Sequence, residues 1–327
     1  MQGPPRAPSE NYRRWKRRQQ RLLILLGVLV LLEIALLARG IMLLPASSAT
    51  ALAPTPTATS TPTPTPSPVP TPPPPTIQAA ASMLEDVSTH RVLTGQNVDA
   101  ELPMASTTKI MTAVVALETG HLDQSVTIGS DVLDLPSDAS RMGLSVGEVL
   151  TMRQLLYGLM LPSGDDAAIA IADAVGKERG ANFIDLMNQQ AQFLGLTHTH
   201  YVNSNGLDAP GHYTTASDLV NLTRFALRLP PFVSLIATYE YKIPATGQHK
   251  AYDLLNTNQL LWPNSGYPGA DGVKTGTTGK AGACLVFSAT RNDHQLVGVV
   301  LDAPSDDARY TEARQMLNWG FSVIGSA

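Results

Sequence analysis

Only one cysteine, Cys284, occurs among the 327 residues of the chain, so no intramolecular disulfide can form. Cys284 lies in the apolar run 281–287, which is typical of a buried strand and favours a packing role over that of nucleophile or ligand. Histidine is also scarce, and His198, His200 and His212 have neither the His-x-x-x-His spacing of a helical metal site nor an adjacent glutamate. We therefore predict no metal and no cofactor, and we assign these histidines to loop packing.

Basic residues are few beyond the N-terminal end of the chain. Residues 77–327 contain 15 Lys and Arg against 25 Asp and Glu, a net charge near −10, and this balance makes nucleic acid an unexpected partner. Residues 1–21, in contrast, carry seven Lys and Arg against Glu10 alone. The stretch 22–44 follows and is apolar except for Glu33, Arg39 and a glycine or two. This order predicts a transmembrane anchor over 22–44 with a basic tail, 1–21, in the cytoplasm.

A cleaved signal peptide is the alternative for residues 22–44, because small residues at 46–49 resemble a cleavage site. Both interpretations export the rest of the chain. We expect either a single-pass protein of the cell membrane with an extracytoplasmic domain or, after cleavage, a secreted one.

A Thr/Pro-rich linker is expected over residues 45–76. It contains eleven prolines between Pro54 and Pro75, and it lacks the apolar side chains that a core needs. At ~3.1 Å per residue its Thr/Pro-rich part, residues 53–76, could hold the next domain, residues 77–327, up to roughly 70 Å from the membrane. A cell-wall polymer lies within that reach.

Ser106 and Lys109 lie three residues apart at the start of an apolar segment that Gly120 ends. This pattern predicts a buried helix whose first turn begins near the serine. Side chains at i and i+3 share a helix face, so a neutral Lys109 amine could accept the Ser106 proton as Ser106 attacks a carbonyl carbon. Unpaired N–H groups in the first turn could hold the resulting oxyanion.

The order of predicted elements indicates an α+β domain, with strands at both ends and helices between them, so that one sheet brings the ends together. We expect strands at 80–86, 91–96, 272–278, 281–291 and 294–301. We expect helices after Ser106, after Thr151, at 167–175, at 182–193 and from Ser305 to Trp319. Thr151 and Gln154 would form a capping box, and the helix at 167–175 would be capped by Asp165 or Asp166 and ended by Gly176. No internal repeat is present.

Two further motifs support the interpretation of Ser106 and Lys109 as a catalytic pair. Ser163-Gly164-Asp165 and then Lys274-Thr275-Gly276-Thr277-Thr278 follow it in the order of the serine D,D-peptidases and β-lactamases. With them, residues 77–327 resemble the low-molecular-weight penicillin-binding proteins, the serine-type D-alanyl-D-alanine carboxypeptidases. The resemblance extends through the segments 103–112, 205–208, 213–216 and 272–276.

The resemblance implies a β-lactamase/D,D-peptidase-like domain, an antiparallel sheet with a helical cluster. It also implies removal of the terminal D-alanine from peptidoglycan stem peptides through an acyl-enzyme, with β-lactam antibiotics as inhibitors. Ser106 would be the nucleophile and Lys109 its general base. Ser163 would relay the proton to the departing D-alanine.

For substrate binding, the resemblance implies that Lys274 holds the terminal carboxylate with help from the Thr275 or Thr277 hydroxyl. The N–H groups of Ser106 and Thr277 would form the oxyanion hole, and Gly276 would let substrate approach the strand closely.

Two features depart from the family. Asp165 stands where relatives commonly have asparagine, whose amide could donate to a substrate carbonyl. A carboxylate cannot donate, and near Lys109 it would favour the protonated amine. Many relatives also continue into a β-rich domain and an amphipathic membrane helix, whereas this sequence extends about 50 residues past Lys274. We expect the N-terminal segment to replace that attachment.

Three other functions use the same residues. A D,D-endopeptidase would cut cross-links with the same groups. A non-catalytic cell-wall-binding protein would use the cleft only to bind. A class A β-lactamase would also need a glutamate on a loop after Ser163, placed to activate the water that hydrolyses the acyl-enzyme.

Overall fold

The computed structural model describes residues 72–324. The predicted basic tail, residues 1–21, and the predicted membrane segment, 22–44, lie outside this range, as does most of the linker. The last linker residues contact the domain, since Trp319 Nε1 donates to Pro72 O at 2.9 Å.

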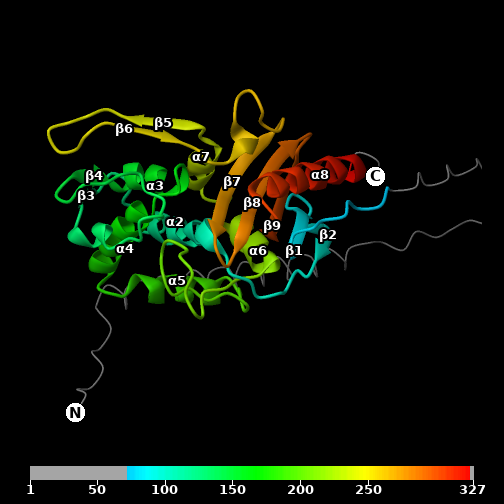
Figure 1. Cartoon of the computed structure of the whole chain (residues 1–327), viewed down its shortest axis with the longest axis horizontal. Helices are drawn as coiled ribbons and strands as arrows, with labels where there is room; N and C mark the ends of the chain where they lie inside the picture. The colour runs from blue at the N-terminus through cyan, green and yellow to red at the C-terminus, as the bar shows by residue number, and fades with distance from the viewer. Residues whose placement is uncertain (1–71, 325–327) are drawn as a thin grey trace, which may run out of the picture. The chain divides into compact units, whose positions relative to one another are not determined.

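Five antiparallel strands form the main sheet in the order β2-β1-β9-β8-β7 (Figure 1). Their bounds are β1 (Ala81–Asp86), β2 (Arg91–Gln96), β7 (Ala270–Thr278), β8 (Gly282–Arg291) and β9 (His294–Ala303). β1 pairs with β9 along its whole length, so the two ends of the domain meet in one sheet. This arrangement confirms the expected α+β class. β7 lies at an edge of the sheet.

Helices cover both faces of the sheet, with α8 (Asp306–Ile324) on one face and α6 (Ala216–Ala226) on the other (Figure 1). Successive residues of a strand point to opposite faces. Leu285 and Phe287 of β8 therefore pack with α8, whereas Val286 belongs to the cluster that includes α6. Because both faces are covered, the central strands are apolar at most positions rather than alternating.

The other elements form a helical cluster and small extensions beside the sheet. They are η1 (Ala105–Thr108), α2 (Lys109–Leu117), β3 (Ser125–Thr127), η2 (Ser130–Leu133), β4 (Val149–Thr151), α3 (Met152–Met160), α4 (Asp165–Arg179), α5 (Phe183–Phe193), α7 (Pro230–Ala237), β5 (Glu240–Ile243), β6 (Tyr252–Leu255) and η3 (Gln259–Leu261). β3–β4 and β5–β6 pair as two small sheets. These strands of three or four residues are too short for a period-2 pattern to identify, and they were not predicted.

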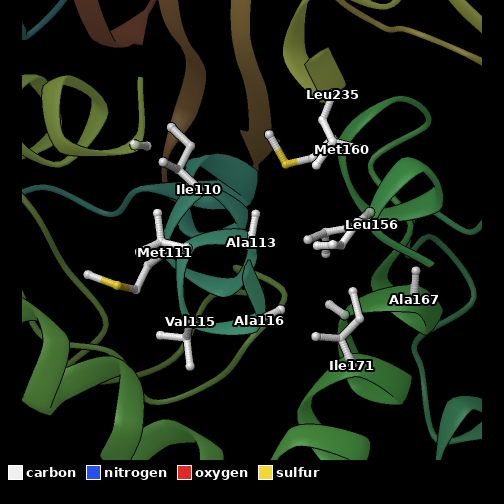
Figure 2. Packing of buried hydrophobic residues seen from close by; sticks show 14 of the residues in the cluster. Ile110, Met111, Ala113, Val115, Ala116, Leu156, Met160, Ala167, Ile171 and Leu235 are labelled. Atoms are coloured by element: carbon white, nitrogen blue, oxygen red, sulfur yellow. The ribbon is translucent and has the colours of Figure 1, made fainter. Parts of the chain in front are cut away.

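Helix α2 occupies the middle of this cluster, and every residue from Lys109 to Ala116 is buried. Figure 2 shows Leu156 of α3 and Ile171 of α4 facing the apolar side chains of α2. A helix that is apolar around its whole circumference needs such cover on all sides. The packing holds the first turn of α2, and with it Lys109, in a fixed place.

The predicted capping box is confirmed, since Thr151 Oγ1 accepts from Gln154 N and Gln154 Oε1 accepts from Thr151 N. The prediction for the next helix was wrong at both ends. α4 begins at Asp165 rather than Ala167 and continues past Gly176 to Arg179, where Gly180, with a φ of 60°, ends it. A single glycine costs a helix only ~1 kcal/mol, which neighbouring packing outweighs.

The last helix begins as predicted, with Ser305 Oγ accepting from Ala308 N, but it runs to Ile324 rather than Trp319. Within residues 72–324, no single helix is both long and apolar enough to cross a bilayer. Only α6 and α7, which meet at a 112° bend, pass such a test as a pair.

Candidate active site

Ser106 lies on the single 3₁₀ turn η1, directly before α2, and Lys109 is the first residue of α2. Ala105, just before the serine, has a φ of 47°, so the backbone turns sharply there. The Lys109 Nζ lies 2.8 Å from Ser106 Oγ. The i, i+3 contact expected from the sequence is therefore present.

The Lys109 side chain is completely buried and has two further partners. Its Nζ donates to Asp165 Oδ1 at 2.6 Å and to the Asn205 carbonyl at 2.5 Å. Burial lowers the pKa of Lys109 below its ordinary value, because a charged amine loses hydration inside the protein, and the Asp165 carboxylate partly offsets this effect. The buried lysine is thus shifted toward the neutral form that a general base requires.

The second motif forms the tight turn between α3 and α4. Ser163 adopts a φ of 64° and is 5% exposed, and its hydroxyl has no hydrogen-bond partner among residues 72–324. Gly164 N donates to Gly158 O at 2.9 Å and Asp165 N to Ser140 O at 2.8 Å, which fixes the turn. The turn brings Asp165 to Lys109.

Asp165 does not cap α4 through its side chain, because its carboxylate binds Lys109. Asp166 does not cap α4 either, because the N-cap residue is Gly164 and has no side-chain cap, while Asp166 Oδ1 accepts from the N–H of the next residue, Ala167, at 2.9 Å. The same carboxylate also accepts from the N–H groups of Met142, Gly143 and Leu144. Of the two predicted capping residues, Asp166 is the one that contacts the backbone.

The third motif lies on β7, beside η1. A Cβ at Gly276 would lie 2.9 Å from Ser106 N, so only glycine lets the strand come this close to the nucleophile. On the other side, Gly206, with a φ of 93°, approaches the same peptide so closely that a Cβ there would overlap Ala105 O and lie 2.9 Å from Ser106 N. The Ala105–Ser106 peptide is therefore held between two glycines.

Lys274 is 1% exposed and has no carboxylate partner in the described part of the chain. Its Nζ donates to Thr275 O at 3.0 Å and lies 3.5 Å from Thr275 Oγ1. Burial, together with the positive charges of Lys109 and Arg309, holds the pKa of Lys274 well below its ordinary value. Thr275 Oγ1 in turn contacts Thr257 Oγ1 at 2.7 Å.

Arg309 of α8 is a site residue that was not predicted. Its Nη1 donates to Gly276 O at 3.1 Å and to Thr277 Oγ1 at 2.8 Å, although it lies 32 residues beyond the motif. Asp208 was also missed as a site residue. It accepts from Thr278 Oγ1 at 2.7 Å and from Lys280 N at 3.1 Å, and so ties the loop after Asn205 to the end of β7. No local sequence pattern predicts either contact, because each depends on how segments that are distant in the sequence pack together.

His198, His200 and His212 each make separate contacts. His212 is buried, contacts Thr108 Oγ1 through Nε2 at 2.8 Å and accepts from Val202 N through Nδ1 at 3.1 Å, and burial lowers its pKa to about 4. His198 contacts Glu101, and His200 contacts Gly211 O. Residues 72–324 contain no group of three or more His, Cys, Asp or Glu side chains placed to hold a metal ion.

Residues 68–305 match the Peptidase_S11 family model, described as D-alanyl-D-alanine carboxypeptidase. The chain belongs to this family. As an S11 peptidase it is a serine-type hydrolase, and the resemblance found in its motifs is confirmed.

Among its S11 relatives, the chain is similar to the D-alanyl-D-alanine carboxypeptidase of Streptomyces sp. (strain K15), with 38% identity over 261 residues, 76% of this chain and 89% of that protein. It is 37% identical over 256 residues to D-alanyl-D-alanine carboxypeptidase DacC of Escherichia coli (strain K12), covering 75% of this chain and 62% of that one. It thus spans about three-fifths of the E. coli relative's length.

Solved structures agree with the sequence relatives. The Streptomyces K15 DD-transpeptidase superposes with a TM-score of 0.71 at 37% identity, covering 76% of this chain and 99% of that one. A D-alanyl-D-alanine carboxypeptidase from Mycobacterium tuberculosis H37Rv gives 0.69 at 30% identity, covering 78% and 95%. The D,D-peptidase fold expected from the sequence is therefore confirmed.

Proposed function

We propose that this S11 peptidase is a D-alanyl-D-alanine carboxypeptidase that removes the terminal D-alanine from peptidoglycan stem peptides through an acyl-enzyme at Ser106. The observation that carries the proposal is the 2.8 Å contact between Ser106 Oγ and the buried Lys109 Nζ. Family membership and the relatives' names support the same activity.

Lys109 Nζ donates to three oxygens, Ser106 Oγ, Asp165 Oδ1 and Asn205 O. When the amine loses one proton, it keeps two N–H donors for Asp165 and Asn205 and gains a lone pair that faces Ser106 Oγ. Ser106 attacks the carbonyl carbon of the penultimate D-alanine while its proton passes to Lys109. The C–N bond breaks, Ser163 relays a proton to the departing D-alanine, and water then hydrolyses the Ser106 ester.

Recognition of the substrate's terminal carboxylate is assigned to the outer end of β7. Lys274 is buried with a strongly lowered pKa, so a full positive charge on it is disfavoured. Arg309 presents a guanidinium, the side-chain group best suited to bind a carboxylate, and already donates to Thr277 Oγ1. We assign the carboxylate to Thr277 and Arg309, with Lys274 acting as an inner hydrogen-bond donor.

The N-terminal region is proposed to anchor the enzyme in the cell membrane, with the S11 domain outside. Its basic residues, the apolar stretch 22–44 and the Thr/Pro-rich linker support this topology. The full-length protein should stay in the membrane fraction in high salt. A soluble extracellular protein whose N-terminus lies near Thr50 would instead support the signal peptide.

The activity is tested by incubating the full-length protein with a stem pentapeptide ending in D-Ala-D-Ala. We expect one equivalent of free D-alanine per peptide, and no release from the same peptide ending in D-Ala-L-Ala. Cleavage confined to cross-linked dimers would support an endopeptidase. Acylation by penicillin without turnover of any peptide would support a binding protein.

A further inference from the structure

The first residue of α8, Asp306, lies at the outer end of the third motif. Its Oδ1 accepts from Thr277 Oγ1 at 3.1 Å and lies 3.2 Å from Arg309 Nη1. Thr277 Oγ1 itself accepts from Arg309 Nη1 at 2.8 Å. Asp306 Oδ1 therefore already contacts both groups, the Thr277 hydroxyl and the Arg309 guanidinium, to which the proposed function assigns the substrate carboxylate.

A threonine hydroxyl has only one proton to donate. In this structure Thr277 gives it to Asp306. A substrate carboxylate can accept that proton only after the Thr277 hydroxyl turns away from Asp306. Until then Asp306 also places a second negative charge next to the incoming anion, and like charges this close repel.

Arg309 does not need Asp306 to remain in place. Its Nη1 also lies 3.1 Å from Gly276 O and 3.4 Å from Cys284 O, and its guanidinium lies 5.1 Å from the centre of the Tyr310 ring. The Arg309 side chain is 8% exposed, whereas that of Asp306 is 60% exposed. Asp306 thus covers the solvent side of a cation that other contacts already hold.

We propose that Asp306 is a specificity-determining residue that competes with the terminal carboxylate of the substrate for Thr277 and Arg309. The inference rests on the proposed function, because it requires that these two residues receive the substrate. Asp306 weakens the binding of anionic peptide ends and leaves neutral ends unaffected. It also favours product release, because the released D-alanine carries a carboxylate at the same position.

The test compares Asp306→Asn with Asp307→Asn in the full-length enzyme. Asp307 is the next residue of α8, it is exposed, and its carboxylate makes no hydrogen bond or ion pair among residues 72–324, so the two variants lose the same charge one residue apart. Each variant is assayed with two stem peptides, one ending in D-Ala-D-Ala and the other in D-Ala-D-alaninamide.

For the carboxylate peptide, Asp306→Asn should lower KM by about threefold to tenfold, the size expected from an exposed ion pair combined with a hydrogen bond. For the amide peptide KM should be unchanged, and Asp307→Asn should match the wild type with both peptides. The KM difference between Asp306→Asn and wild type should shrink at 1 M salt, where the Debye length is ~3 Å.

A higher KM for the carboxylate peptide in Asp306→Asn would overturn the inference, because Asp306 would then hold Arg309 in its working position. Equal changes in KM for Asp306→Asn and Asp307→Asn would also overturn the inference, because the effect would then come from the overall charge of the protein rather than from the position of Asp306. If wild-type enzyme cleaves neither peptide and is not acylated by penicillin, the proposed function itself fails. The first two outcomes leave peptidase activity intact and are therefore distinguishable from the last.

Discussion

The two buried lysines of the site, Lys109 and Lys274, have the same chemistry and opposite surroundings. Lys109 lies 2.6 Å from a carboxylate, that of Asp165, whereas Lys274 has only the carbonyl and hydroxyl oxygens of Thr275. Burial lowers the pKa of both, but the carboxylate partly restores that of Lys109, while two neighbouring cations lower that of Lys274 further.

This difference separates their functions. An amine that can both lose and take up a proton suits Lys109 as a base beside Ser106. A lysine whose pKa is lowered by burial and by neighbouring cations attracts an anion less strongly, which is why the charge for the substrate carboxylate is assigned to Arg309. The position of the charged partner, rather than burial, distinguishes the two sites.

The largest expected effect comes from removing the amine of Lys109. Lys109→Met should slow acylation of Ser106 by penicillin about 10²- to 10⁴-fold, the usual contribution of a general base. Because the change leaves Asp165 buried without its cation, the double variant Lys109→Met/Asp165→Asn should regain thermal stability but not acylation. Lys280→Met, at an exposed lysine near the end of β7, is the control and should acylate normally. Rapid acylation of the double variant would show that another group takes the proton.

Gly206→Ala should produce the next largest effect. The added methyl would overlap the Ala105 carbonyl, and the φ of 93° is strained for alanine, so the Ala105–Ser106 peptide must shift. A displacement of about 1 Å at a reacting group can cost roughly 10²-fold in rate. Stopped-flow acylation measures the loss. Gly279→Ala, whose methyl would enter open space, should leave the rate unchanged, and a normal rate in Gly206→Ala would mean that the peptide between the two glycines need not be fixed.

A smaller effect is expected from Asp165→Asn. The carboxylate raises the pKa of Lys109, so its removal should lower that pKa further and make the neutral amine available at lower pH. The acidic limb of the acylation rate should therefore move to lower pH. Asp173→Asn on the same helix is the control. An acidic limb that stays in place would mean that Asp165 does not set the protonation of Lys109.

Much of the Lys109 side of the site could be predicted from the sequence, because its chemistry is local. The i, i+3 spacing predicted the Ser106–Lys109 contact, and the helix break at Pro162-Ser163-Gly164 predicted the turn that carries Ser163. The departure at Asp165 was also visible in the sequence. Only the structure, however, shows that its carboxylate contacts Lys109 rather than capping α4.

The Lys274 side was less predictable because its partners come from distant segments. Arg309 reaches Thr277 only because α8 packs on β8 and β9, and Gly206 reaches Ala105 from a loop about 100 residues away. Arg309 carries no local signal in the sequence, and the matched segment 205–208 does not show which residue Gly206 approaches. The burial of Lys274 likewise follows from tertiary packing, and its role in binding the carboxylate stays a prediction.

The most direct measurement is covalent labelling of the full-length protein with a fluorescent penicillin, followed by identification of the labelled peptide by mass spectrometry. A β-lactam resembles the acyl-D-Ala-D-Ala bond, so the label should map to Ser106 in the wild type and be absent from Ser106→Ala. Ser106→Ala should melt at nearly the same temperature as the wild type, since the change removes one small hydroxyl. Labelling that persists in folded Ser106→Ala would place the nucleophile elsewhere and contradict the mechanism.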